Sequence, residues 1–336
     1  MANVLITGGA GFIGLNVCIE LVNSGHNVVI VDDLKNSYIT HIKTIIKTHP
    51  NNVLFFKGDV CNKKFMASIF KNNKIDYVVH LAAKKYVAES IEHAADYEQN
   101  NLNSLKVVLE LSKQYSIKKF AFSSTSVVYG NPTNEKPFLE TDKLEPLNPY
   151  AQTKVVGEKL ITDWHNKTGI KTIIFRFTNP VGANTQYMIG DHSKRKKVQL
   201  LPYVVKSALN NKTITLKGNT FNTPDGTPIR SFIHISDLAH AVCVALNNFN
   251  GNLEIFNVGN TNLELSTKQI VLAVQNELNK KVDYNFTAAN PKENAKIACN
   301  CTKFENTFNF KCSKTLKDII SSQIAFENWI TKHFKD

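Results

Sequence analysis

Tyr150 and Lys154 are the first residues whose types and spacing suit chemistry, because they stand four apart directly after Asn148-Pro149. Asparagine at an N-cap and proline at the first helical position predict that a helix begins there. Residues four apart share one helix face, so the phenol and the ammonium become neighbours. A nearby cation lowers the pKa of a tyrosine, which can then act as a general acid and base towards a hydroxyl. The spacing also occurs by chance and identifies no site alone.

A second candidate group lies upstream, where Ser123-Ser124-Thr125-Ser126 ends a predicted strand. The carboxyl ends of parallel strands face the ligand crevice of an α/β sheet. A hydroxyl there can bridge the phenol and a substrate oxygen, and Thr125 is our candidate for that position. An ordinary Ser/Thr turn accounts for the individual serines.

A glycine-rich turn connects the first predicted strand to the first predicted helix and reads Gly8-Gly9-Ala10-Gly11-Phe12-Ile13-Gly14. Glycines in this context permit a tight turn and let the backbone approach a pyrophosphate, which the helix N-terminus then binds. The alternative is a plain glycine turn. The strand–turn–helix context favours a dinucleotide site.

Asp32 ends the second predicted strand. A carboxylate at this point can accept hydrogen bonds from the ribose hydroxyls of adenosine and would repel a 2′-phosphate, which favours NAD over NADP. Asp33 can share this role, or one of the two aspartates caps a turn.

The elements that must position these residues are predicted from apolar periodicity. The predicted strands are residues 4–6, 27–32, 53–59, 76–83, 119–124 and 171–178, and the predicted helices are residues 12–23, 62–71, 100–115 and 149–167. Apolar strands that alternate with helices are typical of a parallel sheet covered on both faces. Right-handed crossovers then give a doubly wound α/β sheet of the Rossmann type.

The second half has a mixed pattern, with predicted loops at residues 184–198 and 218–228. We expect a dinucleotide-binding domain over residues 1–180, a returning segment near 230–260 with a strand at 253–259, and a smaller mixed α/β substrate domain over residues 181–336.

Several further stretches carry a resemblance to a known family. They are Gly58-Asp59-Val60, residues 80–83, Lys85 with residues 88–90, residues 177–183, and residues 223–227 with 229–234 and 237–239. Together with the glycine turn and the Tyr150/Lys154 pair, they resemble the extended short-chain dehydrogenase/reductase family and, within it, the UDP-glucose (UDP-galactose) 4-epimerases. The likeness covers nearly the whole chain.

The resemblance implies NAD as the cofactor, a UDP-sugar as the substrate, and Thr125, Tyr150 and Lys154 as the catalytic group. The implied cofactor contacts are Gly8, Gly11, Phe12, Ile13, Gly14, Asp32, Asp33, Asn36, Asp59, Val60, Ala82, Lys85, Asn101, Tyr150, Lys154 and Phe177. The implied substrate contacts are Lys85, Thr125, Tyr150, Asn179, Gln199, Leu200, Leu201, Arg230, Glu293 and Ile297. His234 and Asp237 are better explained by strand-end packing and a helix cap.

The chain departs from the family pattern around the nucleotide. Ser231 stands where the family usually has aspartate, Gln199 where it has asparagine or histidine, and Asn290 with Glu293 where it has an arginine and an aspartate. Of the three arginines, Arg230 is therefore the one expected at the diphosphate; Arg176 lies within a predicted strand and Arg195 within a basic run. Ile297 replaces a tyrosine of narrow relatives, which predicts room for an N-acetyl group.

Three functions compete. The first is 4-epimerisation by oxidation at C4, turnover of the 4-keto sugar in the pocket and re-reduction. The second is another nucleotide-sugar reaction on the same fold: 4-epimerisation of a different sugar, dehydration or decarboxylation. Ser126 and Val127 stand where related dehydratases have Asp-Glu, which argues against elimination. The third is a silent NAD sensor or a nucleic-acid-binding protein, for which the complete catalytic group is unnecessary.

Composition bounds these alternatives. The net charge of +12 comes from dispersed lysines apart from residues 194–197, a run better explained as a solvated loop than as a nucleic-acid site. The six cysteines show no metal-ligand spacing and are expected to be reduced thiols, so we expect no metal. No apolar run approaches the roughly 20 residues of a membrane span. We expect a cytoplasmic homodimer without nucleic-acid or membrane partners.

Overall fold

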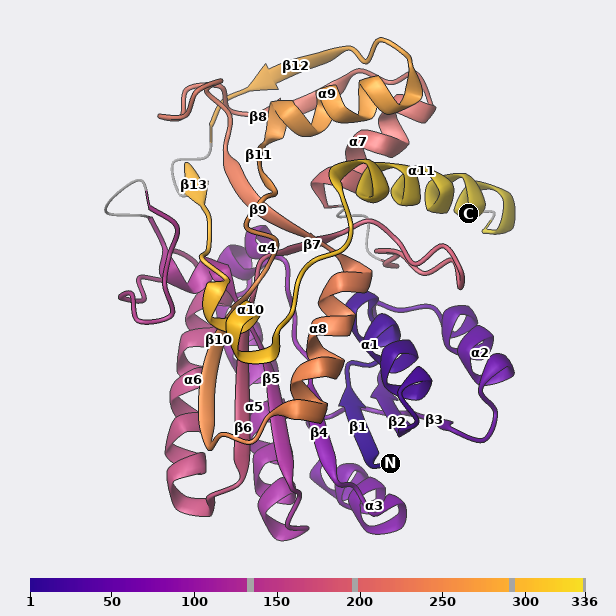
Figure 1. Ribbon diagram of the computed structural model, residues 1–336, viewed down its shortest axis with the longest axis vertical. Helices are drawn as coiled ribbons and strands as arrows, with labels where there is room; N and C mark the ends of the chain where they lie inside the picture. The colour runs from indigo at the N-terminus through magenta and orange to yellow at the C-terminus, as the bar shows by residue number, and fades with distance from the viewer. Residues whose placement is uncertain (132–135, 195–198, 290–293, 335–336) are drawn as a thin grey trace.

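The computed structural model describes residues 1–131, 136–194, 199–289 and 294–334, and within them seven parallel strands form one sheet (Figure 1). In spatial order the strands are β10 (Leu253–Val258), β6 (Lys171–Phe177), β5 (Lys119–Thr125), β4 (Tyr77–His80), β1 (Asn3–Thr7), β2 (Asn27–Asp32) and β3 (Val53–Lys57). All neighbouring strands pair in parallel. The predicted doubly wound sheet is confirmed, including the return of the chain through β10.

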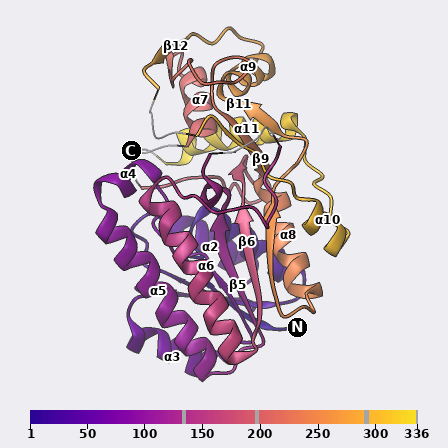
Figure 2. The ribbon, with the colours of Figure 1, turned by 90° about the vertical axis from the view of Figure 1, so that its left-hand side faces the viewer.

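Helices cover both faces of this sheet because its strands are apolar on both sides. One face carries α1 (Phe12–Asn23), α2 (Ile39–Thr48), α8 (Ile235–Asn248) and the short α10 (Thr302–Phe308). The other face carries α3 (Lys63–Asn73), α5 (Ala94–Gln114) and α6 (Pro149–Thr168), which lie side by side in Figure 2, and the short α4 (Val87–Glu92) contacts α5 and α6. The helix predicted to begin at Asn100 starts earlier, at Ala94, and α2 was not predicted.

A second, smaller unit lies over the carboxyl ends of the strands, at the top of Figure 1. Its mixed sheet contains β7 (Asn179–Val181), β9 (Ile229–His234), β11 (Glu264–Ser266) and β13 (Lys296–Ile297), and a separate pair joins β8 (Ile214–Lys217) to β12 (Tyr284–Thr287). The helices α7 (Leu200–Leu209), α9 (Thr267–Leu278) and α11 (Leu316–His333) pack together over an apolar core. This architecture confirms the predicted mixed α/β unit.

The order in which the chain adds strands to the sheet changes side at β1. From β1 the chain proceeds outwards through β2 and β3, whereas β4, β5, β6 and β10 lie on the other side. Ligands of doubly wound sheets bind at the carboxyl ends of the strands beside such a switch point. The turn after β1 and the ends of β4 and β5 therefore border the expected crevice. The 3-10 turn η1 (Ser126–Tyr129) follows β5 directly.

Within the described ranges, no helix is long and apolar enough to cross a membrane. The same residues contain no group of three or more His, Cys, Asp or Glu side chains placed to hold a metal ion. All six cysteines are free thiols. Burial raises the pKa of the Cys18 and Cys299 thiols, so these two side chains stay protonated and belong to the core.

Candidate active site

The backbone of the glycine turn lies so close to neighbouring backbone that no residue with a Cβ atom would fit there. Gly8 has φ +68°, and a Cβ atom on it would lie 2.7 Å from the Cα of Ala82, across the switch point. A Cβ on Gly14 would lie 2.6 Å from the Cα of Gly9. No side chain caps the start of α1 at Gly11, so the first-turn N–H groups, which have no partner within a helix, are available to an anion. This cradle fits the pyrophosphate of a dinucleotide.

Asp32 lies against this turn at the end of β2. Its Oδ2 accepts from the Ala10 N–H at 3.1 Å and its Oδ1 accepts from the Leu34 N–H at 2.9 Å. Burial raises the pKa of Asp32 to about 6. Asp33 instead accepts from the N–H of Lys35 at 2.9 Å and pairs with its ammonium, also at 2.9 Å, in a surface turn. The geometry therefore favours Asp32 over Asp33 as an acceptor for ribose hydroxyls.

The remaining predicted cofactor positions lie at the carboxyl edge of the sheet. Phe12 and Ile13 begin α1, Phe177 ends β6, Asp59 and Val60 follow β3, and Ala82 follows β4. Asn101 on α5 has a positional role: its Oδ1 accepts from the Lys84 N–H at 2.8 Å and its Nδ2 donates to Thr153 Oγ1 at 3.1 Å. It thereby holds the segment after β4 against α6.

Two further residues at this edge, Asp191 and Lys194, were missed by the sequence reasoning, whereas Lys85 was predicted. Lys85 Nζ forms an ion pair with Asp191 at 3.2 Å. Lys194 donates from its N–H to the Asn36 carbonyl and from Nζ to the Leu34 carbonyl, both at 3.0 Å. The predicted loop thus crosses the outer side of the crevice. No local signal marked these contacts, since their partners are more than a hundred residues away.

The predicted catalytic residues come together where β5 meets α6. Asn148 Oδ1 accepts from the Ala151 N–H at 2.9 Å and Pro149 is the first helical residue, so the predicted helix start is confirmed. Thr125 is the last residue of β5, and its side chain lies close enough to the phenol of Tyr150 to oppose the rise in the pKa of that group. Lys154 Nζ lies 5.9 Å from the Tyr150 ring centroid and donates to the Ser123 carbonyl at 2.6 Å.

The expected low pKa of Tyr150 is wrong for the protein without cofactor. Burial raises the pKa of Tyr150 to about 12, and the nearby Thr125 side chain opposes this only in part. Burial also lowers the pKa of Lys154 to about 7. Lys154 is buried and Tyr150 is half-buried, so the cost of charging each of them outweighs the help that their i, i+4 spacing supplies. The phenolate therefore needs a further positive charge, which oxidised NAD carries on its nicotinamide ring.

Three predicted substrate residues lie on one small sheet. Asn179 on β7 donates from Nδ2 to the Ser231 carbonyl of β9 at 3.0 Å. Arg230 on β9 is half-buried, donates from Nη1 to the Ile229 carbonyl at 2.8 Å, and pairs in register with Ile297 of β13. Ile297 itself is 2% exposed. Paired strands from distant parts of the chain thus bring Arg230 and Ile297 side by side.

The other predicted substrate residues lie around α7. Gln199 is its exposed N-cap residue, Leu200 is half-buried, and Leu201 packs into the apolar core of the second unit. The Leu201 side chain is therefore a packing group, and only its backbone could face a ligand. Glu293, with Asn290 and Lys292, lies outside the described residues.

His234 and Asp237 have the structural roles expected of them. His234 Nδ1 accepts from the Ser236 N–H at 3.1 Å and caps α8. Asp237 Oδ1 accepts from the hydroxyl of Ser313 at 2.8 Å, and Oδ2 accepts from the Lys314 N–H at 3.0 Å. These bonds tie the segment before α11 to α8.

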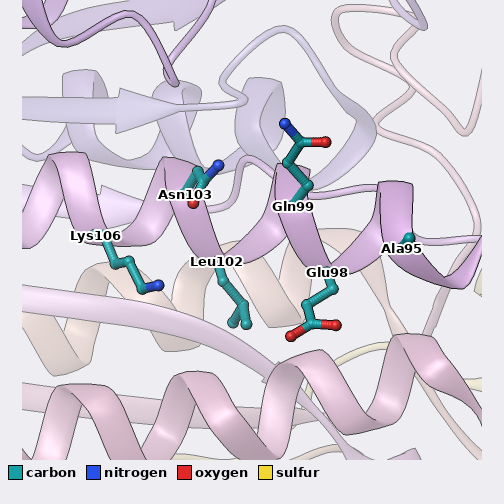
Figure 3. A pocket seen from close by; sticks show the side chains of 6 residues that line it. All are labelled: Ala95, Glu98, Gln99, Leu102, Asn103 and Lys106. Atoms are coloured by element: carbon teal, nitrogen blue, oxygen red, sulfur yellow. The ribbon is translucent and has the colours of Figure 1, made fainter.

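A shallow depression on α5 does not belong to this site. Figure 3 shows its lining, which comes entirely from that helix: Ala95, Glu98, Gln99, Leu102, Asn103 and Lys106. None of these residues lies at the carboxyl end of a strand, where the candidate catalytic group is found. The edge of the sheet that carries the glycine turn and the end of β5, together with the small sheet that contains β9, remains the candidate active site.

The arrangement defines a class of protein: an α/β enzyme with a dinucleotide cradle at the switch point of its sheet and a tyrosine and a lysine at the end of a strand on the same edge. Comparison with known proteins then gives the family. Residues 4–259 match the NAD dependent epimerase/dehydratase family. The chain belongs to this family, and its cofactor is NAD.

Individual relatives agree with this assignment. The chain is 31% identical over 329 residues to a UDP-glucose 4-epimerase of Bacillus subtilis (strain 168), covering 97% of this chain and 96% of that one. The crystal structure of UDP-glucose 4-epimerase from Bifidobacterium longum in complex with NAD⁺ and UDP is similar at a TM-score of 0.92, with 31% identity and 98% of each chain covered. A UDP-Glc/GlcNAc 4-epimerase of Campylobacter jejuni is similar at a TM-score of 0.83, with 27% identity, over 98% of this chain and 100% of that one.

We expect NAD to remain bound through purification, because the glycine turn and Asp32 form a closely fitted cradle. Denatured protein should release about one NAD per chain. Retention should weaken as the pH falls through about 6, since burial raises the pKa of Asp32 to that value and the ionised carboxylate accepts stronger hydrogen bonds from ribose hydroxyls than the protonated group does. Quantifying released dinucleotide after dialysis over a pH series measures both effects.

The matched variant is Asp32→Asn, which should bind NAD more weakly and lose this pH dependence. Recovery of NADP in place of NAD, or unchanged retention by Asp32→Asn, would overturn the assignment of Asp32.

Proposed function

We propose that the protein interconverts UDP-glucose and UDP-galactose as a UDP-glucose 4-epimerase. The observation that carries the proposal is the cluster of Thr125, Tyr150 and Lys154 beside the glycine cradle, where β5 meets α6. Arg230 on the facing small sheet supports it, because a guanidinium suits a diphosphate. The full-length likeness to UDP-glucose 4-epimerases supports the same reaction.

The residues would act as follows. Tyr150 takes the proton from O4 of the sugar, and the Thr125 hydroxyl bridges the phenol and that oxygen. When bound, NAD would supply the acceptor for the hydride of the sugar C4 and, in its reduced form, the donor of that hydride. Arg230 would grip the diphosphate while the 4-keto sugar turns over, so that the opposite face of C4 receives the returning hydride and Tyr150 gives its proton back to O4. Lys154 holds the ribose of the cofactor and favours the phenolate.

The second candidate is another reaction of the same family, on a different sugar or with loss of water or carbon dioxide. Elimination needs an acid beside the sugar to move a proton. The two residues after Thr125 are Ser126, which is buried, and Val127. Neither side chain offers a carboxylate at this position, which favours epimerisation.

The test is product identification. Purified protein is incubated separately with UDP-glucose and with UDP-GlcNAc, and the products are identified by NMR. We expect UDP-galactose and, in the second reaction, UDP-GalNAc. A 4-keto-6-deoxy product would instead indicate a dehydratase. Failure on both sugars, together with salt-sensitive binding to heparin resin, would revive the non-enzymatic alternative.

We expect the pocket to admit N-acetyl sugars, because Ile297 stands beside Arg230 where narrow relatives have a tyrosine. Ile297→Tyr should reduce turnover of UDP-GlcNAc by about tenfold more than turnover of UDP-glucose, which corresponds to about 1.4 kcal/mol of selective steric cost. Steady-state kinetics on both sugars measure this.

Ile297→Leu, of equal volume, is the control and should leave the preference unchanged. An equal loss of turnover on both sugars in Ile297→Tyr would reject a role for Ile297 in sugar preference and would indicate general disruption of this buried strand.

A homodimer also stays a prediction. Sedimentation equilibrium of the NAD-bound protein tests it, and a monomer at micromolar concentration would contradict it.

A further inference from the structure

A buried carboxylate, Glu158, lies one helical turn beyond Lys154 on α6 and has no part in the chemistry described above. It is 5% exposed. Its Oε1 accepts from Arg176 Nε at 3.1 Å and from the Ser124 hydroxyl, and its Oε2 accepts from Arg176 Nη2 at 2.7 Å. Paired bonds from a guanidinium fix the orientation of a carboxylate. Glu158 is therefore an immobile negative charge close to the catalytic lysine.

Three consecutive residues of β5 hold three residues of α6 that are spaced by four. Thr125 lies beside the phenol of Tyr150, Lys154 Nζ donates to the Ser123 carbonyl at 2.6 Å, and the Ser124 hydroxyl donates to Glu158. Residues spaced by four share one helix face. The catalytic face of α6 is thus fastened to the end of β5 along two turns, and Glu158 makes the last of these attachments.

The attachment at Glu158 extends across the sheet. Arg176 on β6 pairs in register with Ser124 on β5 and with Asn257 on β10. Its Nη1 donates to the Tyr129 hydroxyl at 2.9 Å, and that hydroxyl donates to Asn257 Oδ1 at 2.6 Å. Glu158 is therefore tied to three adjacent strands.

On α6, Glu158 is the carboxylate closest in sequence to Lys154, and Arg176 holds it in place. Burial lowers the pKa of Lys154 to about 7, and the Glu158 carboxylate opposes this shift. Burial lowers the pKa of His80 to about 3, so that this ring is neutral. The titratable and charged groups around Lys154 and Glu158 are Tyr150 on α6, His80 on β4, Arg176 on β6 and Tyr129 in η1.

We propose that Glu158 is a positioning residue for the reaction: it fixes the catalytic face of α6 against β5 and keeps Lys154 an ammonium beside Tyr150. The proposal rests on the proposed function, since it assigns the charge on Lys154 a part in that chemistry. Arg176 acts through Glu158 by holding it in place.

The proposed role of the charge on Lys154 predicts how the turnover number of a Glu158 variant depends on pH. Removing the carboxylate lowers the pKa of Lys154, so the variant loses the ammonium at a lower pH than the wild type. At acidic pH the lysine is charged in both proteins, and their turnover numbers differ only by the loss of positioning. At alkaline pH the variant is neutral first, so its deficit grows by about tenfold for each unit of lowered pKa.

The test compares Glu158→Gln with the wild type, as NAD-bound protein, over a pH series. We expect the wild-type to variant ratio of kcat to rise about tenfold from the acidic to the alkaline end. Arg176→Lys is the matched control: it loses the paired bonds but retains both charges, so it should melt earlier with a pH profile of wild-type shape. Glu158→Gln leaves the buried guanidinium of Arg176 without its carboxylate partner, which destabilises the fold, so the double variant Glu158→Gln/Arg176→Met is measured too. For the double variant, the ratio of kcat should also rise with pH, but by a smaller factor.

A second readout needs no substrate. Competitive acetylation, quantified for the peptide that contains Lys154, gives the pKa of that amine in each protein. We expect a value at or above neutral pH in the wild type and a lower one in the Glu158 variants. A ratio of kcat that is constant with pH, or a wild-type Lys154 that titrates well below neutrality, would overturn the proposal. Absence of any UDP-sugar turnover in the wild type would instead reject the proposed function, and the acetylation result would still decide the role of Glu158.

Discussion

Tyr150→Phe is expected to reduce epimerisation by about a thousandfold, which is the scale on which a positioned general acid and base contributes. The substitution removes one hydroxyl and leaves the ring in place, so α6 should keep its packing against β5. NAD content should stay close to that of the wild type, since the glycine turn and Asp32 are untouched. Turnover of UDP-glucose, the melting temperature and the released NAD are measured on the same preparation.

Thr125→Val is the companion to this variant. It keeps the shape of the side chain and removes the hydroxyl beside Tyr150, so it should be slower than the wild type but still active. Wild-type turnover in Tyr150→Phe would exclude Tyr150 from the proton transfer and contradict the mechanism.

Arg230→Lys is expected to raise the KM for UDP-sugars by about tenfold or more, equivalent to about 1.4 kcal/mol of lost binding. Lysine keeps the charge but cannot reproduce the paired N–H bonds of a guanidinium to a diphosphate. A poorly anchored 4-keto sugar can escape before the hydride returns. Reduced cofactor should therefore accumulate on the enzyme during prolonged turnover, which near-ultraviolet absorbance detects.

Arg176→Lys provides the contrast, because that arginine is buried in the sheet and bonded to Glu158. It should lower the melting temperature and leave the KM unchanged. An Arg230→Lys enzyme with the KM of the wild type and no reduced cofactor would show that another residue anchors the diphosphate.

The first half of the fold could be predicted because its signals are local. The bounds of β2 and α1 were predicted at their observed residues, 27–32 and 12–23, since an apolar run and a glycine turn mark them directly. The start of α6 followed from Asn148-Pro149 in the same way. The helix α2 carries isoleucine at positions 39, 42, 45 and 46, an apolar helical pattern that the sequence reasoning did not use.

The second unit could not be predicted in this detail because its strands are short and depend on distant partners. β13 contains two residues and is a strand only through its pairing with β9. Sequence alone therefore could not predict that Arg230 lies beside Ile297. The resemblance placed both residues at the substrate, but no periodicity in the sequence did.

The electrostatics of the site could not be predicted from spacing either. Spacing of four made Tyr150 and Lys154 neighbours, yet the sequence gives no measure of their burial, which raises the pKa of the first and lowers that of the second. The same limitation hid Glu158, although it continues the spacing Tyr150, Lys154, Glu158. Only the bonds to Ser124 and Arg176 show that its carboxylate faces this group.

The most direct test of the central claim follows the hydrogen at C4. The NAD-bound protein is incubated with UDP-glucose that carries deuterium at C4, in ordinary water, and the UDP-galactose formed is analysed by NMR and mass spectrometry. If C4 is oxidised and re-reduced within one closed site, the deuterium stays at C4 of the product and none enters the solvent. Loss of the deuterium to water, or formation of UDP-galactose by a Tyr150→Phe enzyme at the wild-type rate, would contradict this account.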